Sequence, residues 1–493
     1  MSSTIEAIGT RVLREPATFM VLVAIWLALL AWMRPLALPD EGRYLDIARW
    51  MAESGDWIVP RVNGLPFLHK PPLYFWLEAG AIQTLGLSPF VGRLVSIASA
   101  VAMCSCVLWV VRRTHDDASA RWSVAALALN PLFYGGAQFA NLDMLVAALI
   151  TVTIVLGFVA VTSPTPERPI WCAAYVSAAF AVLAKGLIGV LIPGLVLVAW
   201  AFACRRPSLI TKAISPAGAL LFAIIVAPWF VAVETRYPGF VRYFIGYHHI
   251  ERFLESGFNN RQGVWFYPAV LVGAMLPWTV APLINWRTAM TARAPELSLH
   301  TLAGVWFVVV LVFFSIPPSK LVGYIFPLLP AFAIFIGPWF ATYRYRRATA
   351  VIGALLCVSA VPIATFLKPT GPLGLATTYR TRIAAADRVV FLNKYFFDAA
   401  VALDRRMPIY VKDDWSKRAD QLPDNIHRQF TEGREFEAAS GRALISKEEL
   451  DELLGHSQPV WIFAEESAWL AEPKLQKLAR VASEGRFVLL RAN

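Results

Sequence analysis

Charged residues that could bind or activate a substrate are concentrated in one stretch near the N-terminus, residues 39–78. Asp40 could accept a proton, whereas Arg43 and Lys70 could hold an anion such as a phosphate. Aromatic and turn residues lie between them, and a segment that only joined two helices would not need this composition. The residues alone leave an alternative open, in which Asp40 caps a helix, Arg43 pairs with it and Lys70 extends to lipid headgroups.

Two helices are predicted to carry these residues. The first begins at Asp40, which could cap it, and ends at Gly55. Its apolar positions follow the spacing of one helix face, at Tyr44, Ile47, Ala48 and Met51. The Asn-Gly at 63–64 indicates a turn, and the Pro-Pro at 71–72 begins a second helix rich in aromatic residues. Both are expected to be juxtamembrane helices that lie along a membrane surface.

The apolar content of the chain predicts a membrane protein. Of its 493 residues, 57% are hydrophobic and 16% are charged, against about a quarter charged in soluble proteins. The apolar residues fall into blocks of about twenty, the length that crosses a hydrocarbon core. We predict an all-α polytopic membrane domain of about eleven transmembrane helices, within a range of about eleven to thirteen. The predicted spans are 17–38, 88–111, 118–137, 142–162, 170–184, 186–203, 210–231, 265–285, 299–315, 321–341 and 346–368.

The basic residues predict the orientation of these spans. Lys and Arg gather in alternate loops and in the N-terminal residues 1–16, which are therefore expected in the cytoplasm. This topology accounts for the net charge of +11, and no nucleic-acid partner is expected. The loops 39–87 and 232–264 and the C-terminal residues 369–493 then lie on the opposite side, which is the periplasm in a bacterium. The expected location is the cell inner (plasma) membrane.

The C-terminal residues 369–493 have a different pattern from the membrane domain, residues 17–368. Short apolar runs alternate with charged stretches of helical spacing, which predicts a small soluble α/β domain. The runs are residues 389–392, 408–411, 442–445, 459–464 and 487–490. All five cysteines lie in apolar blocks outside this domain, so no disulfide framework is expected.

The first long loop resembles that of a known enzyme family, in the stretch DEGRYLDIARWMAESGDWIVPRVNGLPFLHKPPLYFWL. The stretch combines an Asp-Glu pair, an Arg-Tyr pair and the motifs SGDW, NG and KPPL. Further matching segments are Asn141-Leu142-Asp143, Leu183-Ala184-Lys185-Gly186, His249-Ile250-Glu251-Arg252-Phe253, Trp265-Phe266-Tyr267, Leu276-Pro277-Trp278, and Ser319-Lys320-Leu321 with Tyr324 and Pro327. On these motifs, roughly residues 15–340 resemble the GT-C glycosyltransferases. The nearest branch is that of the aminoarabinose transferases that modify lipid A, which are similar to protein O-mannosyltransferases.

The resemblance implies a membrane glycosyltransferase with a periplasmic active site. Members of the family transfer a hexose or pentose from a polyprenyl phosphate, such as undecaprenyl phosphate, to an acceptor outside the cytoplasm. The acceptor implied here is lipid A or another glycolipid of the cell envelope. The departing phosphate must be stabilised by cations, and the acceptor must be held in line with the anomeric carbon. A hydroxyl acceptor also needs a base, whereas a phosphate acceptor is already charged.

The resemblance also assigns roles to residues of this chain. Asp40 matches the family's catalytic aspartate, and Asp143 matches a second functional acid, for which a helix cap is the alternative. Glu41 and Lys185 are secondary candidates. The residues expected to hold the donor phosphate are Arg43, Lys70, Arg252, Lys320 and Tyr324. Each cation alone could instead reach to the headgroups, and the tyrosine could serve only as an interfacial anchor.

A metal site is a further hypothesis. In the aminoarabinose branch, a histidine at the position of His249 and a glutamate just before the KPPL lysine can bind zinc. This chain has His69 where that glutamate would be. Because histidine is also a zinc ligand, a divalent metal held by His249 and His69 remains a hypothesis, although the resemblance does not imply it directly.

Three alternatives to a lipid A transferase remain open. A protein O-glycosyltransferase acting on Ser or Thr hydroxyls would use Asp40 as a base. A lipid-carrier transporter or flippase would place ionisable residues near the membrane midplane, on helices related by repeats. The candidates here lie at span ends, and no repeat is visible in the sequence. A receptor with a sensing tail would tolerate alanine at Asp40, Arg43 and Lys70.

Overall fold

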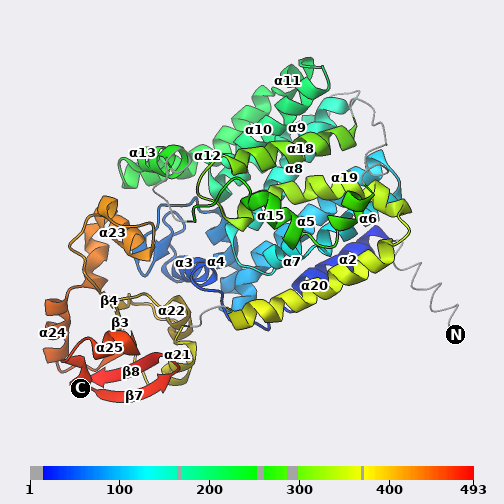
Figure 1. Cartoon of the computed structure of the whole chain (residues 1–493). Helices are drawn as coiled ribbons and strands as arrows, with labels where there is room; N and C mark the ends of the chain where they lie inside the picture. The colour runs from blue at the N-terminus through cyan, green and yellow to red at the C-terminus, as the bar shows by residue number, and fades with distance from the viewer. Residues whose placement is uncertain (1–14, 164–167, 252–259, 286–297, 368–370, 493) are drawn as a thin grey trace. The chain divides into compact units, whose positions relative to one another are not determined.

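The computed structural model describes residues 15–163, 168–251, 260–285, 298–367 and 371–492 (Figure 1). The chain divides into two compact units. We call the first the helical unit and the second the loop–sheet unit. The helical unit comprises Met1–Arg34 and Arg93–Phe366, and the loop–sheet unit comprises Pro35–Gly92 and Leu367–Asn493.

Apolar helices make up the helical unit. Its first half contains α2 (Pro16–Ala28), most of α5 (Pro89–Thr114), α6 (Asp117–Ala128), α7 (Pro131–Ala137), α8 (Leu142–Thr162), α9 (Arg168–Lys185), α10 (Ile188–Ala203) and α11 (Ser208–Ala213). Its second half contains α12 (Pro216–Arg236), α13 (Phe240–Arg242), the π-helix η1 (Tyr243–Glu251), α15 (Phe266–Ala274), α16 (Val280–Ile284), α18 (Leu299–Ser315), the 3₁₀ helix η2 (Val322–Leu328), α19 (Leu329–Thr342) and α20 (Arg346–Leu367).

Five helical segments in the described part of the chain are long and apolar enough to cross a membrane. They are α5, α8, α12, η2 together with α19, and α20 as far as Ile363. Three shorter apolar helices, α2, α10 and α18, fall below that length. The count of about eleven spans therefore stays a prediction.

Some of the predicted spans are divided into shorter helices, as two examples show. The span predicted at 118–137 becomes α6 and α7, because the Asn130 side chain caps α7 and Pro131 is its first residue. The span predicted at 265–285 becomes α15 and α16, with Pro277 between them. Proline has no backbone N–H and so favours a helix boundary at both places.

Burial differs strongly between the apolar helices of this unit. The most apolar part of α8 is 83% buried, and the helix packs against α9 and η2. The corresponding parts of α12 and α20 are only 17% and 22% buried. A helix that is apolar and exposed is expected where lipid covers it, whereas α8 forms part of the protein interior.

The loop–sheet unit combines the first loop with the C-terminal residues. The loop contributes α3 (Asp40–Ser54), β1 (Arg61–Val62), β2 (Leu65–Pro66) and α4 (Leu73–Leu85). The C-terminal residues contribute α21 (Leu373–Tyr379), β3 (Arg388–Leu392), α22 (Phe397–Leu403), β4 (Tyr410–Lys412), η3 (Ala419–Gln421), α23 (Ile426–Phe436), η4 (Ala438–Ala443), β5 (Leu444–Ile445), α24 (Lys447–Gly455), β6 (Val460–Glu465), α25 (Glu466–Leu470), η5 (Leu475–Lys477), β7 (Ala479–Glu484) and β8 (Phe487–Ala492).

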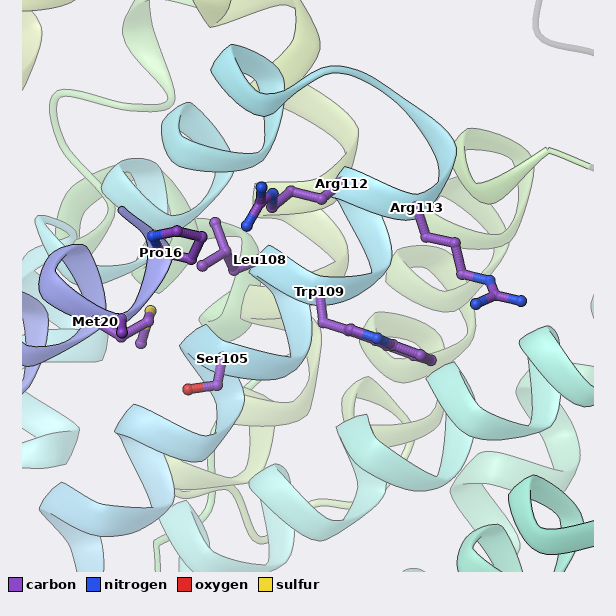
Figure 2. A pocket seen from close by; sticks show the side chains of 8 residues that line it. Pro16, Met20, Ser105, Leu108, Trp109, Arg112 and Arg113 are labelled. Carbon is purple, nitrogen blue, oxygen red and sulfur yellow. The ribbon is translucent and has the colours of Figure 1, made fainter. Parts of the chain in front are cut away.

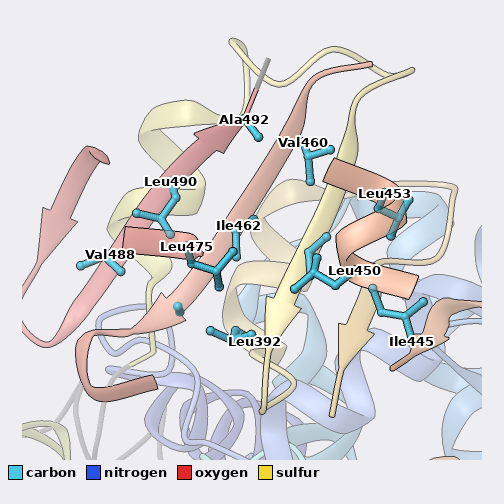
Figure 3. Close-up of a cluster of buried hydrophobic side chains, with 12 residues drawn as sticks. Leu392, Ile445, Leu450, Leu453, Val460, Ile462, Leu475, Val488, Leu490 and Ala492 are labelled. Carbon is cyan, nitrogen blue, oxygen red and sulfur yellow. The ribbon is translucent and has the colours of Figure 1, made fainter. Parts of the chain in front are cut away.

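The predicted α/β character of the C-terminal residues is confirmed by a six-stranded sheet of order β5-β4-β3-β6-β8-β7. The strands β5, β4, β3 and β6 pair in parallel, and β8 and β7 add an antiparallel edge. Each of the five predicted apolar runs contains or overlaps a strand, but β7 was not predicted because it is mostly exposed. Alternate residues of β3, β6 and β8 point to one face, where Leu450 and Leu453 of α24 cover them (Figure 3).

Polar contacts join the first loop to the C-terminal residues within this unit. The Asn63 side chain donates to the Ile409 carbonyl and accepts from the Ile409 N–H, both at 2.8 Å. Arg61 Nη2 lies 2.9 Å from Glu437 Oε2. Packing is also close, because a Cβ added at Gly42 would lie 2.6 Å from the Cβ of Phe397. The loop therefore folds as part of the same compact body as the sheet, an association that its sequence alone did not indicate.

Candidate active site

Asp40 begins α3 but does not cap it. The N-cap residue is Pro39, and no side chain caps the helix. The Asp40 carboxylate instead accepts a 2.6 Å hydrogen bond from Arg43 Nη2, one helical turn later. The capping prediction was therefore wrong, and the pairing that accompanied it is confirmed. An acid in the first turn still interacts favourably with the positive end of the helix.

Arg43 is held by more than Asp40. Its Nη1 donates to Gln429 Oε1 of α23 at 3.4 Å, and its guanidinium lies over the Tyr44 ring at 5.3 Å. Burial disfavours the charge of Arg43, but Tyr44 and Asp40 outweigh burial and raise its pKa. Arg43 is thus a permanent cation beside a half-exposed carboxylate, and Gln429 contributes from a segment that the motifs did not cover.

Glu41 and Glu78 lie buried in the same unit. Glu41 Oε2 accepts from the Ala37 N–H at 2.7 Å, which ties the carboxylate to the turn before α3. Both carboxyl oxygens of Glu78 lack a hydrogen-bond partner among the described residues. Burial, and then the nearby Glu41, raise the pKa of Glu78 well above its usual range. Sequence reasoning missed Glu78, although an acid within the otherwise apolar α4 was a signal that could have found it.

His69 and Lys70 precede α4. His69 Nε2 lies 2.8 Å from Glu432 Oε2 of α23, and the His69 ring stacks on Phe67. Lys70 is half-buried beside it in the chain. In the described ranges, no group of three His, Cys, Asp or Glu side chains could hold a metal ion. The structure describes the backbone of His249 but not its side chain, so a metal at His249 and His69 stays a prediction.

A second cluster, in the helical unit, contains Asp143, Lys185 and Tyr324. Lys185 Nζ contacts Asp143 Oδ1 and lies 4.2 Å from the centre of the Tyr324 ring. Asn141 caps α8 by accepting from the Asp143 N–H at 2.8 Å, so Asp143 is not the cap. Gly323 allows this approach, because an added Cβ there would lie 2.5 Å from Asp143 Oδ2. Lys185, a secondary candidate on sequence, is thus a direct partner of both Asp143 and Tyr324.

Lys320 contacts backbone carbonyls. Its buried Nζ donates to the Gln262 carbonyl at 2.9 Å and to the Pro317 carbonyl. The Lys320 N–H donates to the Asn260 carbonyl, and Arg261 pairs with Ser319, so the two segments are held side by side. Burial lowers the pKa of Lys320. These contacts fit a positioning role for Lys320, whereas Arg252 lies outside the described residues.

Several known proteins are similar to this chain in sequence. The family described as dolichyl-phosphate-mannose-protein mannosyltransferase matches residues 69–231. An undecaprenyl phosphate-α-4-amino-4-deoxy-L-arabinose arabinosyl transferase from Sodalis glossinidius is 30% identical over 360 residues, which are 71% of this chain and 65% of that protein. An enzyme of the same description from Erwinia tasmaniensis is 27% identical over 327 residues, or 66% and 59% of the two chains. The chain thus spans less than two thirds of the length of either relative.

The fold comparison covers nearly the whole chain. ArnT from Cupriavidus metallidurans, in a crystal structure bound to undecaprenyl phosphate, superposes with a TM-score of 0.82 at 21% identity, covering 96% of this chain and 97% of that one. The chain resembles the aminoarabinose transferases. This resemblance is the one that the motifs had indicated, and the apolar helices support a multi-pass membrane protein.

Proposed function

We propose that this protein is a membrane glycosyltransferase that moves a sugar from undecaprenyl phosphate, or a similar polyprenyl phosphate, to lipid A or another envelope glycolipid. The observation that carries the proposal is the Asp40–Arg43 pair, a half-exposed carboxylate 2.6 Å from a largely buried cation. The pair stands in the DEGRY motif, and the relatives named above supply the donor and sugar class. Aminoarabinose is accordingly the first sugar to test.

The proposed reaction exchanges one bond at the anomeric carbon for another. The bond from that carbon to the carrier phosphate breaks, and the phosphate leaves with the electron pair. Cations lower the barrier by stabilising the charge that develops on this phosphate. The candidates are Arg43, Lys70 and Arg252. Arg43 is suited to a two-point contact because its guanidinium is planar and always charged.

The new bond joins the anomeric carbon to an acceptor oxygen. If the oxygen belongs to a phosphate of lipid A, it is already ionised, and Asp40 serves mainly to orient Arg43. If the oxygen belongs to a hydroxyl, its proton passes to the Asp40 carboxylate. The half-exposed carboxylate at the end of α3 supports both roles, because it can be reached by a substrate while Arg43 holds it in place.

Asp143, Lys185 and Tyr324, in the helical unit, are proposed as further candidates for donor binding. The Lys185 ammonium is fixed by the Asp143 carboxylate and the Tyr324 ring, which supports a preorganised cation for a phosphate. Lys320 is proposed to position the segment that precedes Tyr324. Under the proposed topology, which has the N-terminus in the cytoplasm and about eleven spans, both sets of residues and the C-terminal residues 369–493 would lie on the periplasmic side of the inner membrane.

Comparison of a deletion strain with its parent tests the proposal. Lipid A and surface glycans from both strains are analysed by mass spectrometry. Loss of a mass that corresponds to one aminopentose or hexose on lipid A in the deletion strain supports the proposal, and restoration by the wild-type chain but not by an Asp40→Ala variant assigns the loss to this site. An unchanged glycome in the deletion strain would contradict the proposed transferase function.

A protein O-glycosyltransferase is the second candidate. The match of residues 69–231 to the protein mannosyltransferase family favours it. Under this alternative, the mass lost in the deletion strain appears on Ser or Thr residues of exported proteins, and lipid A is unchanged. The same mass spectrometry applied to periplasmic glycopeptides distinguishes the two acceptors.

A further inference from the structure

A groove in the helical unit lies between α2 and the C-terminal half of α5. It has a volume of about 490 Å³ and is lined by Pro16, Ala17, Met20, Ser105, Leu108, Trp109, Arg112 and Arg113. Figure 2 shows Arg112 extending across it toward Pro16 and Leu108, with Arg113 on the far side of Trp109. The groove therefore has an apolar floor and two arginines at one end.

The arginine end of this α2–α5 groove has one excess positive charge, because Arg112, Arg113 and Arg121 outnumber Asp116 and Asp117 by one. Arg112 Nε pairs with Asp117 Oδ1 at 3.1 Å, and Asp117 also pairs with Arg121 at 2.6 Å. Arg113 lies over the Trp109 ring at 5.9 Å. Asp116 is engaged in capping α6. Arginine and tryptophan together at the end of an apolar helix are typical of the level of lipid headgroups.

The α2–α5 groove is distant from the Asp143 cluster. The Ser96 hydroxyl of α5 donates to the Asn141 carbonyl, next to Asp143, so the N-terminal part of α5 adjoins that cluster. Arg112 is at the other end of the helix, roughly 24 Å along its axis at 1.5 Å per residue. That separation approaches the thickness of a hydrocarbon core, so a lipid in this groove would be a different molecule from a donor held near Asp143.

We propose that the α2–α5 groove binds an anionic membrane phospholipid, with its phosphate on Arg112 and Arg113 and an acyl chain along Pro16, Ala17, Met20 and Leu108. One end of the groove is cationic and the rest is apolar. A molecule with an anionic head and an apolar tail matches both parts, so we infer that the occupant is an amphiphile. The site is independent of the proposed sugar transfer, and its test does not use transfer activity.

Native mass spectrometry of the delipidated full-length protein tests this site. Phosphatidylglycerol and phosphatidylcholine of the same chain length are titrated separately. The wild type is expected to bind phosphatidylglycerol more tightly, and Arg112→Ala/Arg113→Ala to lose about thirtyfold in that affinity, at roughly fivefold per arginine. Affinity for phosphatidylcholine should change little. The Ala17→Trp variant, which fills the apolar floor, should lose binding of both lipids at this site.

Arg344→Ala/Arg347→Ala is the matched control. It removes two arginines from another loop predicted on the cytoplasmic side, and Arg344 lies over Tyr345 much as Arg113 lies over Trp109. The control should keep wild-type affinity within about twofold. Equal affinity for the two lipids, or equal losses in the two double variants, would overturn the proposal. Wild-type phosphatidylglycerol affinity in the Arg112→Ala/Arg113→Ala variant would overturn it too, provided that the melting temperature without lipid shows that the variant is folded.

Discussion

Helix α3 carries two aspartate–arginine pairs, one in its first turn and one near its middle. In the first turn, Asp40 Oδ1 lies 2.6 Å from Arg43 Nη2; near the middle, Asp46 Oδ1 lies 2.7 Å from Arg49 Nη2. The residue types and the i,i+3 spacing are identical. The side chains of Asp40 and Arg43 are 49% and 17% exposed, whereas those of Asp46 and Arg49 are 0% and 2% exposed.

The surroundings of the middle pair explain why its role differs. The Tyr395 hydroxyl donates to Asp46 Oδ2 at 2.9 Å, and Arg49 Nη1 donates to the Arg405 carbonyl at 2.7 Å. Asp46 and Arg49 therefore tie the first loop to the C-terminal residues, while Asp40 keeps its carboxylate accessible. Spacing identifies an ion pair, but burial decides whether the pair holds the fold or can act on a substrate.

The largest expected effect is on activity at Asp40. Asp40→Asn should reduce sugar transfer by about 10²- to 10⁴-fold if the acceptor is a hydroxyl, because a general base is lost. With a phosphate acceptor, the loss should be about tenfold, through the lost orientation of Arg43. Single-turnover transfer with purified protein and polyprenyl-phosphate sugar measures the effect, and the melting temperature should stay within about 2 °C because an exposed pair contributes little.

Transfer by Asp40→Asn within twofold of wild type would contradict the catalytic assignment. Asp46→Asn is the matched control, because it removes the same charge from the same helix. The folded fraction of the Asp46→Asn protein should transfer sugar at the wild-type rate. Equal losses of transfer rate in Asp40→Asn and Asp46→Asn would show that the two aspartate–arginine pairs do not differ in role.

The next effect is on stability at Asp46. Asp46→Ala removes the more deeply buried of the two carboxylates that pair with Arg49, leaving Glu53, and it leaves the Tyr395 hydroxyl without its acceptor. The free energy of unfolding should fall by roughly 1–3 kcal/mol, the cost of buried polar groups that lose a partner. Denaturant unfolding of detergent-solubilised protein, followed by the fluorescence of tryptophans in the loop–sheet unit, measures it. An Asp40→Ala variant should change the same transition by less than about 1 kcal/mol, and similar changes in the two variants would contradict the comparison.

Much of the fold could be predicted because hydrophobic patterns are local. The blocks of apolar residues and the five short runs of the C-terminal residues are visible in any window of the sequence, and helices and strands formed there. The strand β7 and the division of span 118–137 were missed. Exposed edge strands lack an apolar pattern, and the helix break depends on one Asn-Pro step at 130–131.

The candidate site could be predicted only in part, because its partners are distant in the sequence. Asp40 and Arg43 are close along one helix, so their pairing was readable from spacing. The contacts of Arg43 with Gln429 and of His69 with Glu432 join residues more than 300 positions apart, and nothing in either segment alone indicates the other. The sequence makes Lys185 only a secondary candidate, because its partnership with Asp143 depends on the tertiary packing of α8 and α9.

A smaller, pH-dependent effect is expected at Asp398, a buried carboxyl without a cationic partner among the described residues. Burial raises the pKa of Asp398 to about 6, although backbone N–H groups such as that of Ala399 oppose the shift. The folded state therefore binds this proton more tightly than the unfolded state does. The resulting stability is present below pH 4 and is lost as the pH rises through 6.

Asp398→Asn removes this proton linkage. As the pH rises from 4 to 7, the free energy of unfolding of the variant should increase by about 1 to 3 kcal/mol relative to that of the wild type. Melting temperatures of both proteins across this range measure the gain. A difference that is flat with pH, or that moves the other way, would contradict the assignment and would suggest that Asp398 resembles the arginine-paired aspartates of α3.

The smallest expected effect concerns Gln429, which links the C-terminal residues to the exposed pair. At 3.4 Å the hydrogen bond from the Arg43 cation to the uncharged Gln429 side chain is long, so it should contribute only about 0.5–1 kcal/mol. Gln429→Leu should therefore lower kcat/KM about two- to fivefold, through kcat, because Arg43 is less well oriented rather than absent. Gln476→Leu changes a glutamine whose side chain, within the described residues, bonds only to the Leu470 carbonyl, far along the chain from α23, and it should have no effect. If kcat/KM were unchanged in both variants, Arg43 would be positioned by Asp40 and Tyr44 alone. The C-terminal residues would then support the Asp40–Arg43 pair only through their contacts with the buried Asp46–Arg49 pair.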